Sequence, residues 1–476
     1  MSENRLTRRS LLASSAVIAA GGVLAACAQP TPTAAPQAPS PAPQVEAPTA
    51  ESPTGAPQPA GPSGALIRHW TAWSSVTFSD AWNEIQKSDD FKQALGDNVY
   101  EMKTGVGDEA LLTAVASGDP PEGASNVESL DFMARDVLFA IDELVAASQI
   151  IKKDNFLPGI WDLCMYKGKT LSMPFMEGFV PYGLVYNSKL AQEAGLDPTK
   201  PPVTWDQVYD WQVKLTQKDA AGNVTRMGLD PFAAMGQGIW FAGGFMAATS
   251  WGWKWFDEST RTFNFDNEKM VDAFATFKKL VDVVGIDNLM AVYATEGQDE
   301  WGGAYYAEIQ SMLINGYWFP GEAMNNNPEV AKGTMATWLP VPESRRGTKV
   351  QSVYTSMLIL FRQSKNPEVM YRIGEIMTLK PACDAVFNKT GWLPPIKTYL
   401  DTVDPSVYPG LDFYFDCVKE ATEWHRPAVC EITRYASNKY AALREQVCRG
   451  ELTPEEAAKL FQSDCTQEYI NQGFAS

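Results

Sequence analysis

Short apolar runs alternate with longer segments of helical periodicity in the first half of this chain. Residues 66–70 and 99–102 are short apolar runs that predict strands. Between them, residues 78–95 carry large apolar side chains at the spacing of one helix face. Residues 125–127 predict a further strand. Strands that alternate with helices in this way are typical of a mainly parallel α/β sheet.

Two predicted strands near the middle of the chain are separated by a break in the pattern. Residues 170–174 and 184–186 predict the strands, and the segment between them contains Gly178, Pro181 and Gly183. Glycine permits a positive φ and proline fixes φ, which suits a chain that leaves one lobe and enters another. Roughly 410 residues follow the N-terminal region, which exceeds the usual limit of one hydrophobic core, so two lobes are expected.

Later segments repeat both kinds of pattern. Residues 268–283 predict an amphipathic helix, and residues 336–342 and 353–361 predict two strands. Residues 237–249 predict a further helix. The tryptophans of residues 251–255 occupy alternate positions, which is typical of a strand.

The N-terminal segment has the pattern of an export signal. Arg5, Arg8 and Arg9 precede an uncharged run over residues 10–26, which is short for a membrane span. Residues 7–12 resemble a twin-arginine signal. We therefore expect export of the chain from the cytoplasm.

The residues that follow the apolar run predict a membrane anchor. The tetrapeptide Leu-Ala-Ala-Cys that ends at Cys27 resembles a bacterial lipobox, which implies lipidation of Cys27. An ordinary cleaved signal with an incidental cysteine is the alternative. Residues 28–64 are rich in Pro and Ala and contain no aromatic residue, so they predict a disordered stalk. The expected arrangement is a signal peptide at 1–26, a lipid anchor and linker at 27–64, and an extracytoplasmic protein tethered to the cell membrane.

The charge and the motifs that are missing restrict the classes of partner. The formal net charge is −18 at pH 7, and such an acidic chain argues against nucleic acid or anionic lipid as the main partner. The sequence contains no Walker-type phosphate loop and no long apolar span after residue 26. Its only histidines are His69 and His425, and it has no Cys-x-x-Cys pair, so neither a metal site nor a cofactor is expected.

Six further cysteines follow Cys27. An even set of cysteines in an exported protein favours disulfides, so we expect at least one bridge among them. These cysteines are Cys164, Cys383, Cys417, Cys430, Cys448 and Cys465.

The order of short motifs around the predicted crossing resembles a known family. Pro174-Phe175 is followed by Tyr-Asn-Ser-Lys-Leu at 186–190, Ala-Gly-Leu-Asp-Pro at 194–198 and Thr-Trp-Asp-Gln at 204–207. This order is similar to that of the extracellular solute-binding proteins of ABC importers, the maltose-binding-protein-like group. The resemblance extends over roughly residues 66–470.

This resemblance implies a two-lobed periplasmic-binding-protein fold of type II, with mainly parallel sheets flanked by helices and three hinge crossings. It implies a first lobe at 65–179 and 350–392, and a second lobe at 180–349 and 393–470. The expected protein is a monomer that captures a small solute without catalysis. It would deliver this solute to ABC permease subunits in the membrane.

Candidate ligand-binding residues are aromatic rings and hydrogen-bonding groups beside turns. Fifteen tryptophans are unusually many for this length. Their faces pack well against the C–H groups of sugars, while carboxylates and amides bind the hydroxyls. Trp318 follows Asn315-Gly316, in a segment that resembles one where the family's Trp faces the ligand. Ligands also bind beyond the carboxyl ends of parallel strands.

The candidate set combines these criteria, and packing in the core or on the surface is the alternative for each tryptophan in it. Trp82, Trp205 and Trp211 lie on predicted helices and are expected to be structural. The candidates are Trp73, Asn126, Glu128, Glu177, Trp240, Trp251, Trp318, Tyr354 and Trp392.

Other functions fit parts of the pattern. Glu128 and Glu177 are possible catalytic carboxylates of a secreted glycoside hydrolase, although the sequence does not give their separation. A receptor for peptides or polyamines would have more acidic than aromatic residues in its cleft. Ser250 lacks the first glycine of a nucleophile elbow, which argues against a serine hydrolase. The sequence therefore favours a receptor, without enzymatic activity, for a mono- or oligosaccharide.

Overall fold

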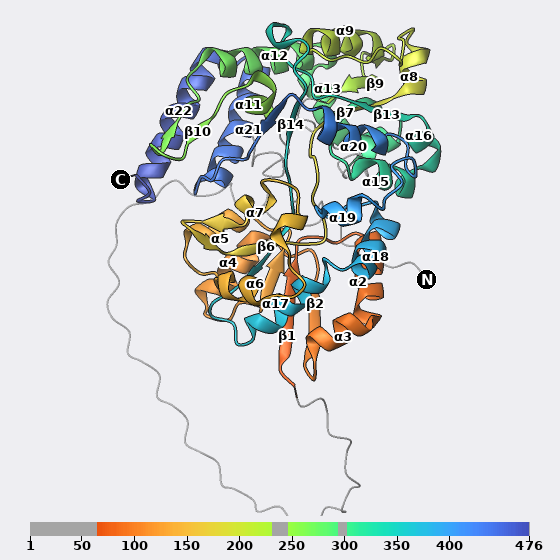
Figure 1. The fold of residues 1–476 in the computed structure, drawn as a ribbon. Helices are drawn as coiled ribbons and strands as arrows, with labels where there is room; N and C mark the ends of the chain where they lie inside the picture. Colours follow the sequence, from red (N-terminus) through yellow and green to blue (C-terminus); the bar gives the residue numbers. More distant parts are fainter. Residues whose placement is uncertain (1–63, 231–245, 294–301, 476) are drawn as a thin grey trace, which may run out of the picture. The chain divides into compact units, whose positions relative to one another are not determined.

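The computed structural model describes residues 64–230, 246–293 and 302–475. The chain divides into two units, Met1–Pro59 and Ala60–Ser476, and every described residue belongs to the second. Strands and helices alternate along this unit and build two five-stranded sheets (Figure 1). The predicted α/β fold class is confirmed.

The first sheet has the strand order β2-β1-β3-β15-β6. β1 pairs in parallel with β2 and β3, whereas β15 runs antiparallel to both β3 and β6. Four of the five strands therefore point in one direction. The strands are β1 (Leu66–Thr71), β2 (Val99–Lys103), β3 (Gly123–Ser125), β6 (Ser172–Pro174) and β15 (Met357–Leu360).

Helices pack against the first sheet through their apolar faces, and serine residues cap the first turns of two of them. The Ser75 hydroxyl accepts a hydrogen bond from the Phe78 N–H where α2 begins, and Ser88 does the same for Phe91 in α3. Trp82 on α2 is fully buried, so its predicted structural role is confirmed. α2 packs against α18, and α3 packs against α17. The helices of this part are α2 (Val76–Lys87), α3 (Asp89–Leu95), α4 (Asp108–Ala116), α5 (Ser129–Ala134), α6 (Asp142–Ala147), α7 (Ile160–Leu163), α17 (Pro367–Ile376) and α18 (Lys380–Thr390).

The second sheet has the order β13-β7-β12-β9-β8 and is mixed rather than mainly parallel. Only β12 and β9 pair in parallel; β7 runs antiparallel to both β12 and β13, and β8 runs antiparallel to β9. β7 is the strand that enters this sheet directly from the first one. The strands are β7 (Gly183–Asn187), β8 (Gln217–Lys218), β9 (Val224–Leu229), β12 (Gln310–Asn315) and β13 (Thr334–Thr337).

Capping residues also set the helix starts around the second sheet. Thr204 and Gln207 form a capping box at the start of α9, and Thr453 and Glu456 form one at the start of α22. The predicted amphipathic helix at 268–283 is confirmed as α12. Trp205 and Trp211 on α9 are buried, as expected for structural residues. The helices are α8 (Ser188–Glu193), α9 (Trp205–Leu215), α11 (Met246–Trp251), α12 (Glu268–Val284), α13 (Ile286–Tyr293), α14 (Gly303–Tyr306), α15 (Phe319–Asn326), α16 (Pro328–Lys332), α20 (Leu411–Glu420), α21 (Thr433–Arg449) and α22 (Pro454–Asn471).

The strand predicted over the alternating tryptophans is wrong. Trp251 is the last residue of α11, and Gly252 then turns the chain with φ +74°. Trp253 and Trp255 follow in irregular backbone, and strand β10 begins only at Phe256. The helix predicted at 237–249 lies mostly outside the described residues. The remaining short elements are β4 (Met165–Tyr166), β5 (Lys169–Thr170), β10 (Phe256–Asp257), β11 (Thr262–Phe263), β14 (Val350–Ser352), β16 (Glu423–His425), α19 (Lys397–Leu400) and the 3₁₀ turns Lys153–Asn155 and Glu343–Arg345.

Three segments connect the two sheets and their helices. The first leads from β6 to β7 over residues 175–182, and the second from β13 to β15 over residues 338–356. The third follows α18, which packs on α2, and leads over residues 391–410 to α20, which packs on β13. The three predicted crossings are therefore present.

The cysteine prediction is wrong for the cysteines that the structure describes. All six are free and buried. They lie in three different apolar clusters, where burial raises the pKa of thiols such as Cys164 and Cys383 to about 12. These side chains therefore serve as small apolar core residues.

Candidate functional site

Glu177 lies in the first crossing and has three hydroxyl groups around its carboxylate. The side chain is 5% exposed. Its Oε2 accepts a hydrogen bond of 2.5 Å from the Tyr317 hydroxyl, and its Oε1 accepts bonds from Tyr354 (3.0 Å) and Ser356 (2.7 Å). Burial raises the pKa of Glu177, and these three hydrogen bonds oppose that rise. The predicted acceptor thus links the first crossing, the second crossing and the residues after β12.

Trp73 and Trp392 form an aromatic pair between the end of β1 and the third crossing. Their ring centroids lie 5.2 Å apart with an interplanar angle of 34°. Trp73 is half-buried, whereas Trp392 is 6% exposed. The Trp392 indole N–H donates to Oε1 of Glu322 on α15 at 3.1 Å. Two candidates from distant parts of the sequence are therefore brought together, beside a carboxylate that sequence reasoning missed.

Trp318 follows β12 and stands immediately before α15. Its ring centroid lies 5.6 Å from that of Tyr354 and 5.3 Å from that of Tyr317. It is half-buried and contacts the main apolar clusters of both sheets. The ring covers Gly316, where an added Cβ would lie 2.4 Å from the indole carbon Cζ3, so a side chain at this position would displace the Trp318 ring.

These residues form one group, which we call the crossing cluster: Trp73, Glu177, Tyr317, Trp318, Glu322, Tyr354 and Trp392. The Glu322 N–H bonds to the Trp318 carbonyl, which connects the two aromatic pairs through the first turn of α15. Burial, followed by the charge of Glu177 and with a smaller contribution from Glu322, raises the pKa of Tyr354 well above 10. The tyrosine hydroxyls thus stay neutral and act as hydrogen-bonding groups.

Sequence reasoning missed Tyr317 and Glu322. Tyr317 directly precedes Trp318. Glu322 lies four residues after Trp318, which places the two side chains on the same face of α15. The spacing from Trp318 could have identified Glu322 as a candidate.

Asn126 and Glu128 follow β3 and are not part of the crossing cluster. Asn126 has a positive φ of 55°, in the left-handed region. Burial, the charge of Asp108 and the charge of Asp131 raise the pKa of Glu128 to about 7, while Arg434 opposes the rise. Glu128 therefore lies in a charged group with Arg434 of α21 and with the carboxylates of Asp108 and Asp131.

One further predicted site residue that the structure describes, Trp251, lies apart from these groups. Trp251 is 2% exposed, stacks on Trp205 and donates its indole N–H to Asp272 Oδ2 at 2.7 Å. Its position gives it a packing role in the core, so the predicted ligand contact has no support in this arrangement. Trp240 and Cys27 lie outside the described residues.

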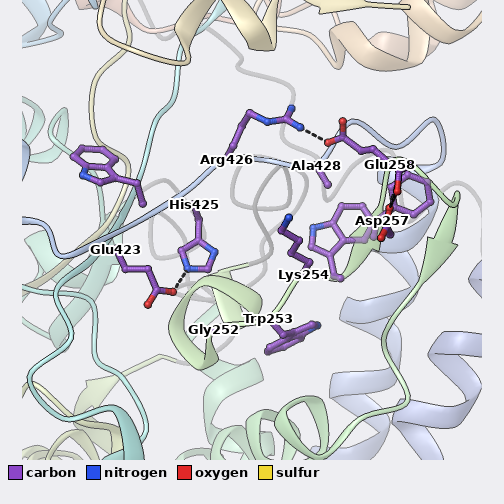
Figure 2. Close-up of a pocket in the computed structure, with 13 residues that line it drawn as sticks. Gly252, Trp253, Lys254, Asp257, Glu258, Glu423, His425, Arg426 and Ala428 are labelled. Carbon is purple, nitrogen blue, oxygen red and sulfur yellow. Dashed lines mark hydrogen bonds and ion pairs between the residues drawn. The ribbon is translucent and has the colours of Figure 1, made fainter.

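A separate cavity of about 690 Å³ is lined by residues 252–259, residues 423–426 and Ala428 (Figure 2). In it, Arg426 Nη2 bonds to Glu258 Oε1 at 2.5 Å, and His425 Nε2 lies 2.6 Å from Glu423 Oε1. None of the predicted ligand-binding residues that the structure describes lines this cavity. A neighbouring cavity of about 490 Å³ is mainly apolar and is lined by residues such as Leu157, Val180, Val353, Val418 and Trp424.

Neither a metal site nor a membrane-spanning helix is found in the described part of the chain. Over residues 64–230, 246–293 and 302–475, no three His, Cys, Asp or Glu side chains are grouped so that they could hold a metal ion. No helix in the same ranges combines the length and the apolar character that a membrane span needs. His69 is buried between Tyr100 and Ser125, and burial lowers its pKa to about 3.

Solved structures resemble this arrangement over most of its length. CpMnBP1 with mannobiose bound is 19% identical, with a TM-score of 0.72, and the match covers 84% of this chain and 99% of that one. The GacH receptor of Streptomyces glaucescens, solved unliganded and with acarbose, is 17% identical with a TM-score of 0.67, and the match covers 85% and 98%. The maltose/maltodextrin-binding domain MalE from Bdellovibrio bacteriovorus, bound to maltotriose, is 18% identical with a TM-score of 0.64, and the match covers 85% and 100%. These similarities establish the two-lobed fold.

Sequence comparison identifies the family. No curated protein sequence matches the chain. The family profile described as bacterial extracellular solute-binding protein matches residues 98–372, which is more than half of the chain. Together with the two sheets and their three crossings, this match shows that the chain belongs to the bacterial extracellular solute-binding proteins.

Proposed function

We propose that this protein is the extracytoplasmic receptor of an ABC import system and that it binds a carbohydrate between two lobes. The observation that carries the proposal is the crossing cluster, in which the rings of Trp73, Trp318, Tyr354 and Trp392 accompany the carboxylate of Glu322. Aromatic faces pack against the C–H groups of a sugar ring, and carboxylates accept hydrogen bonds from its hydroxyls. Structures of the same fold with mannobiose, acarbose or maltotriose support this ligand class.

The lobes close over the ligand by rotation about the three crossings. We assign residues 65–179 and 350–392 to the first lobe, and residues 180–349 and 393–470 to the second. The closed form delivers the sugar to permease subunits in the membrane, and the ATPase of the importer is another polypeptide. The receptor acts as a monomer.

The chemistry of the two candidate carboxylates supports a receptor rather than a glycoside hydrolase. A hydrolase needs one carboxyl group free to donate a proton and a second free to attack or to activate water. Both oxygens of Glu177 already accept hydrogen bonds from tyrosine and serine hydroxyls. Glu128 lies among other charged groups, beside Asp108, Asp131 and Arg434.

We also propose that the chain is exported through its twin-arginine-like signal and is anchored as a lipoprotein through Cys27. Replacement Cys27→Ala removes the acceptor of the lipid. The variant should therefore leave the membrane fraction of the native host and appear in the soluble fraction, with an unchanged melting temperature. Equal fractionation of variant and parent would contradict the anchor.

A thermal-shift screen over sugars, polyols, peptides and polyamines tests the ligand class. A ligand that binds only the folded state stabilises it by about 2.7 kcal/mol at a concentration of 100 Kd. Mono- or oligosaccharides should raise the melting temperature, whereas the other classes should not. A shift with peptides or polyamines alone would replace the carbohydrate proposal.

A further inference from the structure

Residues 429–434, which follow β16 and include the first two residues of α21, join the part of the chain built on the second sheet to the part built on the first. Cys430 and Ile432 of this segment are buried in the apolar cluster of the second sheet. Val429 instead packs against the cluster of the first sheet that contains Tyr166. We call the part of the chain built on the first sheet the first side and the part built on the second sheet the second side. The side chains of the segment therefore pack alternately on the two sides.

The start of the segment is held on the second side. Glu258, which follows β10, accepts hydrogen bonds at its Oε1 from the Arg426 guanidinium (2.5 Å) and from the Val429 N–H (3.0 Å). Figure 2 shows the first of these bonds beside the cavity. Because Glu258 fixes the backbone at Val429, the side chains that follow project from a defined position.

Glu431 is a buried carboxylate shared by both sides. It accepts a hydrogen bond of 2.6 Å from the Tyr166 hydroxyl of β4, on the first side. On its own side it accepts a bond of 2.9 Å from Tyr469 and pairs with Arg261. Burial raises the pKa of Glu431, but the hydrogen bonds from Arg261 and Tyr166 outweigh it, so the net shift is downward and the group stays ionised.

Arg434, in the first turn of α21, pairs with two acids of the first side. Its guanidinium contacts Asp108, the first residue of α4, and lies 3.7 Å from Asp131 of α5. Asp108 also accepts a hydrogen bond from the Glu128 N–H at 3.0 Å, so this pair is connected to the loop after β3. An arginine that faces two carboxylates is a strong attachment point, since charge-assisted bonds are about twice as strong as neutral ones.

We propose that residues 429–434 form a latch that holds the two lobes closed before any ligand binds. These contacts lie outside the three crossings, so they break when the lobes separate. They need no ligand, because only side chains of this chain take part. The latch therefore shifts the open–closed equilibrium of the free receptor toward the closed state. This inference concerns the receptor's conformational equilibrium and does not depend on the ligand being a sugar.

The test measures the separation of the lobes without ligand. In a full-length chain with Cys27→Ala, Gln93→Cys on α3 and Lys214→Cys on α9 place one spin label on each lobe, at exposed positions. The six native cysteines are buried, so they should not react with the label. Distances between labels are then measured by pulsed electron paramagnetic resonance.

Removal of the latch contacts should open the receptor. Arg434→Met with Tyr166→Phe should raise the ratio of open to closed molecules by roughly tenfold or more, which corresponds to about 1.4 kcal/mol. Arg449→Met is the matched control, because Arg449 at the other end of α21 pairs with Glu445 and Asp287 of the second lobe alone. Its distance distribution should equal that of the parent.

The single variant Tyr166→Phe keeps the ring and removes only one hydroxyl, so it should fold and still show partial opening. Melting curves of each variant verify folding. The latch is refuted if the double variant, folded, keeps the parent's distance distribution, or if the unliganded parent is already open.

Discussion

At the scale of single residues, the buried carboxylate of Glu177 connects segments that are far apart in the sequence. Glu177 is held by Tyr317, Tyr354 and Ser356, which come from segments about 140 to 179 positions away in the sequence. This carboxylate holds the rings of Tyr317 and Tyr354 in the crossing cluster. Its primary effect should therefore appear in the stability of the free protein.

Glu177→Ala should lower the free energy of unfolding by about 2–4 kcal/mol, because it leaves three buried hydroxyl donors without their acceptor. Urea unfolding of the ligand-free protein measures this change. Glu329→Ala is a suitable control, since Glu329 lies on the surface of α16 and pairs only with nearby Lys332; it should change stability by less than about 0.5 kcal/mol. Equal effects of the two substitutions on stability would show that Glu177 has no structural role.

Glu128 should give the protein a defined pH dependence. Its pKa in the folded protein is about 7, above the ordinary value of 4.5, because of burial and the charges of Asp108 and Asp131, with Arg434 opposing them. Between these two pH values the folded protein binds a proton that the unfolded chain releases. The contribution of Glu128 to stability is therefore present at low pH and is lost as the pH rises toward 7.

Replacement Glu128→Gln removes this titration and with it the loss of stability as the pH rises toward 7, so stability should be similar to that of the parent at pH 5 and higher than that of the parent at pH 8. The difference should be on the order of 1–2 kcal/mol, because solvent screens a half-buried group. Urea unfolding of both proteins from pH 5 to pH 8 measures it. Parallel pH profiles would show that Glu128 titrates normally.

Trp318 and Trp251 should behave differently although both were expected to contact ligand. Trp318→Ala removes a half-buried ring of the crossing cluster and should weaken sugar binding by about 2–4 kcal/mol, or roughly 30- to 1,000-fold. Trp251→Ala removes a core ring and should lower stability by about 3–5 kcal/mol, with little change in affinity. Calorimetric titration and thermal melting of both variants distinguish the two roles, and the reverse pattern would exchange their assignments.

At the scale of elements, the sequence predicts starts and periods well. Thr204 before α9 and Asn267 before α12 have side chains that cap the first turn, so local chemistry determines where these helices begin. The tryptophans at 251–255 mislead because alternation is also compatible with a helix end followed by irregular chain. Gly252, with its positive φ, is the local signal that ends α11 there.

The cysteines mislead for a related reason. Their even number suggests pairing, but pairing requires two side chains to meet at a specific distance. In the structure all six described cysteines are free and buried in apolar clusters, and a sequence pattern does not distinguish a buried thiol from a half-cystine.

At the scale of the whole molecule, the two-lobed fold was predictable and the contacts between distant segments were not. The crossings follow from glycine and proline positions and from the resemblance in motif order. The partners of Glu177, the bond from Trp392 to Glu322, and the pairs made by Arg434 join residues 70 to 326 positions apart. No local pattern specifies which of many tyrosines, acids or arginines will meet.

Isothermal titration of the purified protein with manno- and malto-oligosaccharides, combined with analysis of the sugar afterwards, is the direct test of a receptor that binds carbohydrate without cleaving it. We expect saturable binding of one sugar per protein molecule, with the sugar recovered intact. The apolar burial expected from stacking on the crossing cluster should give a negative heat-capacity change. Hydrolysis of the sugar during the titration would contradict the receptor, and the absence of binding to any mono- or oligosaccharide would contradict the carbohydrate ligand.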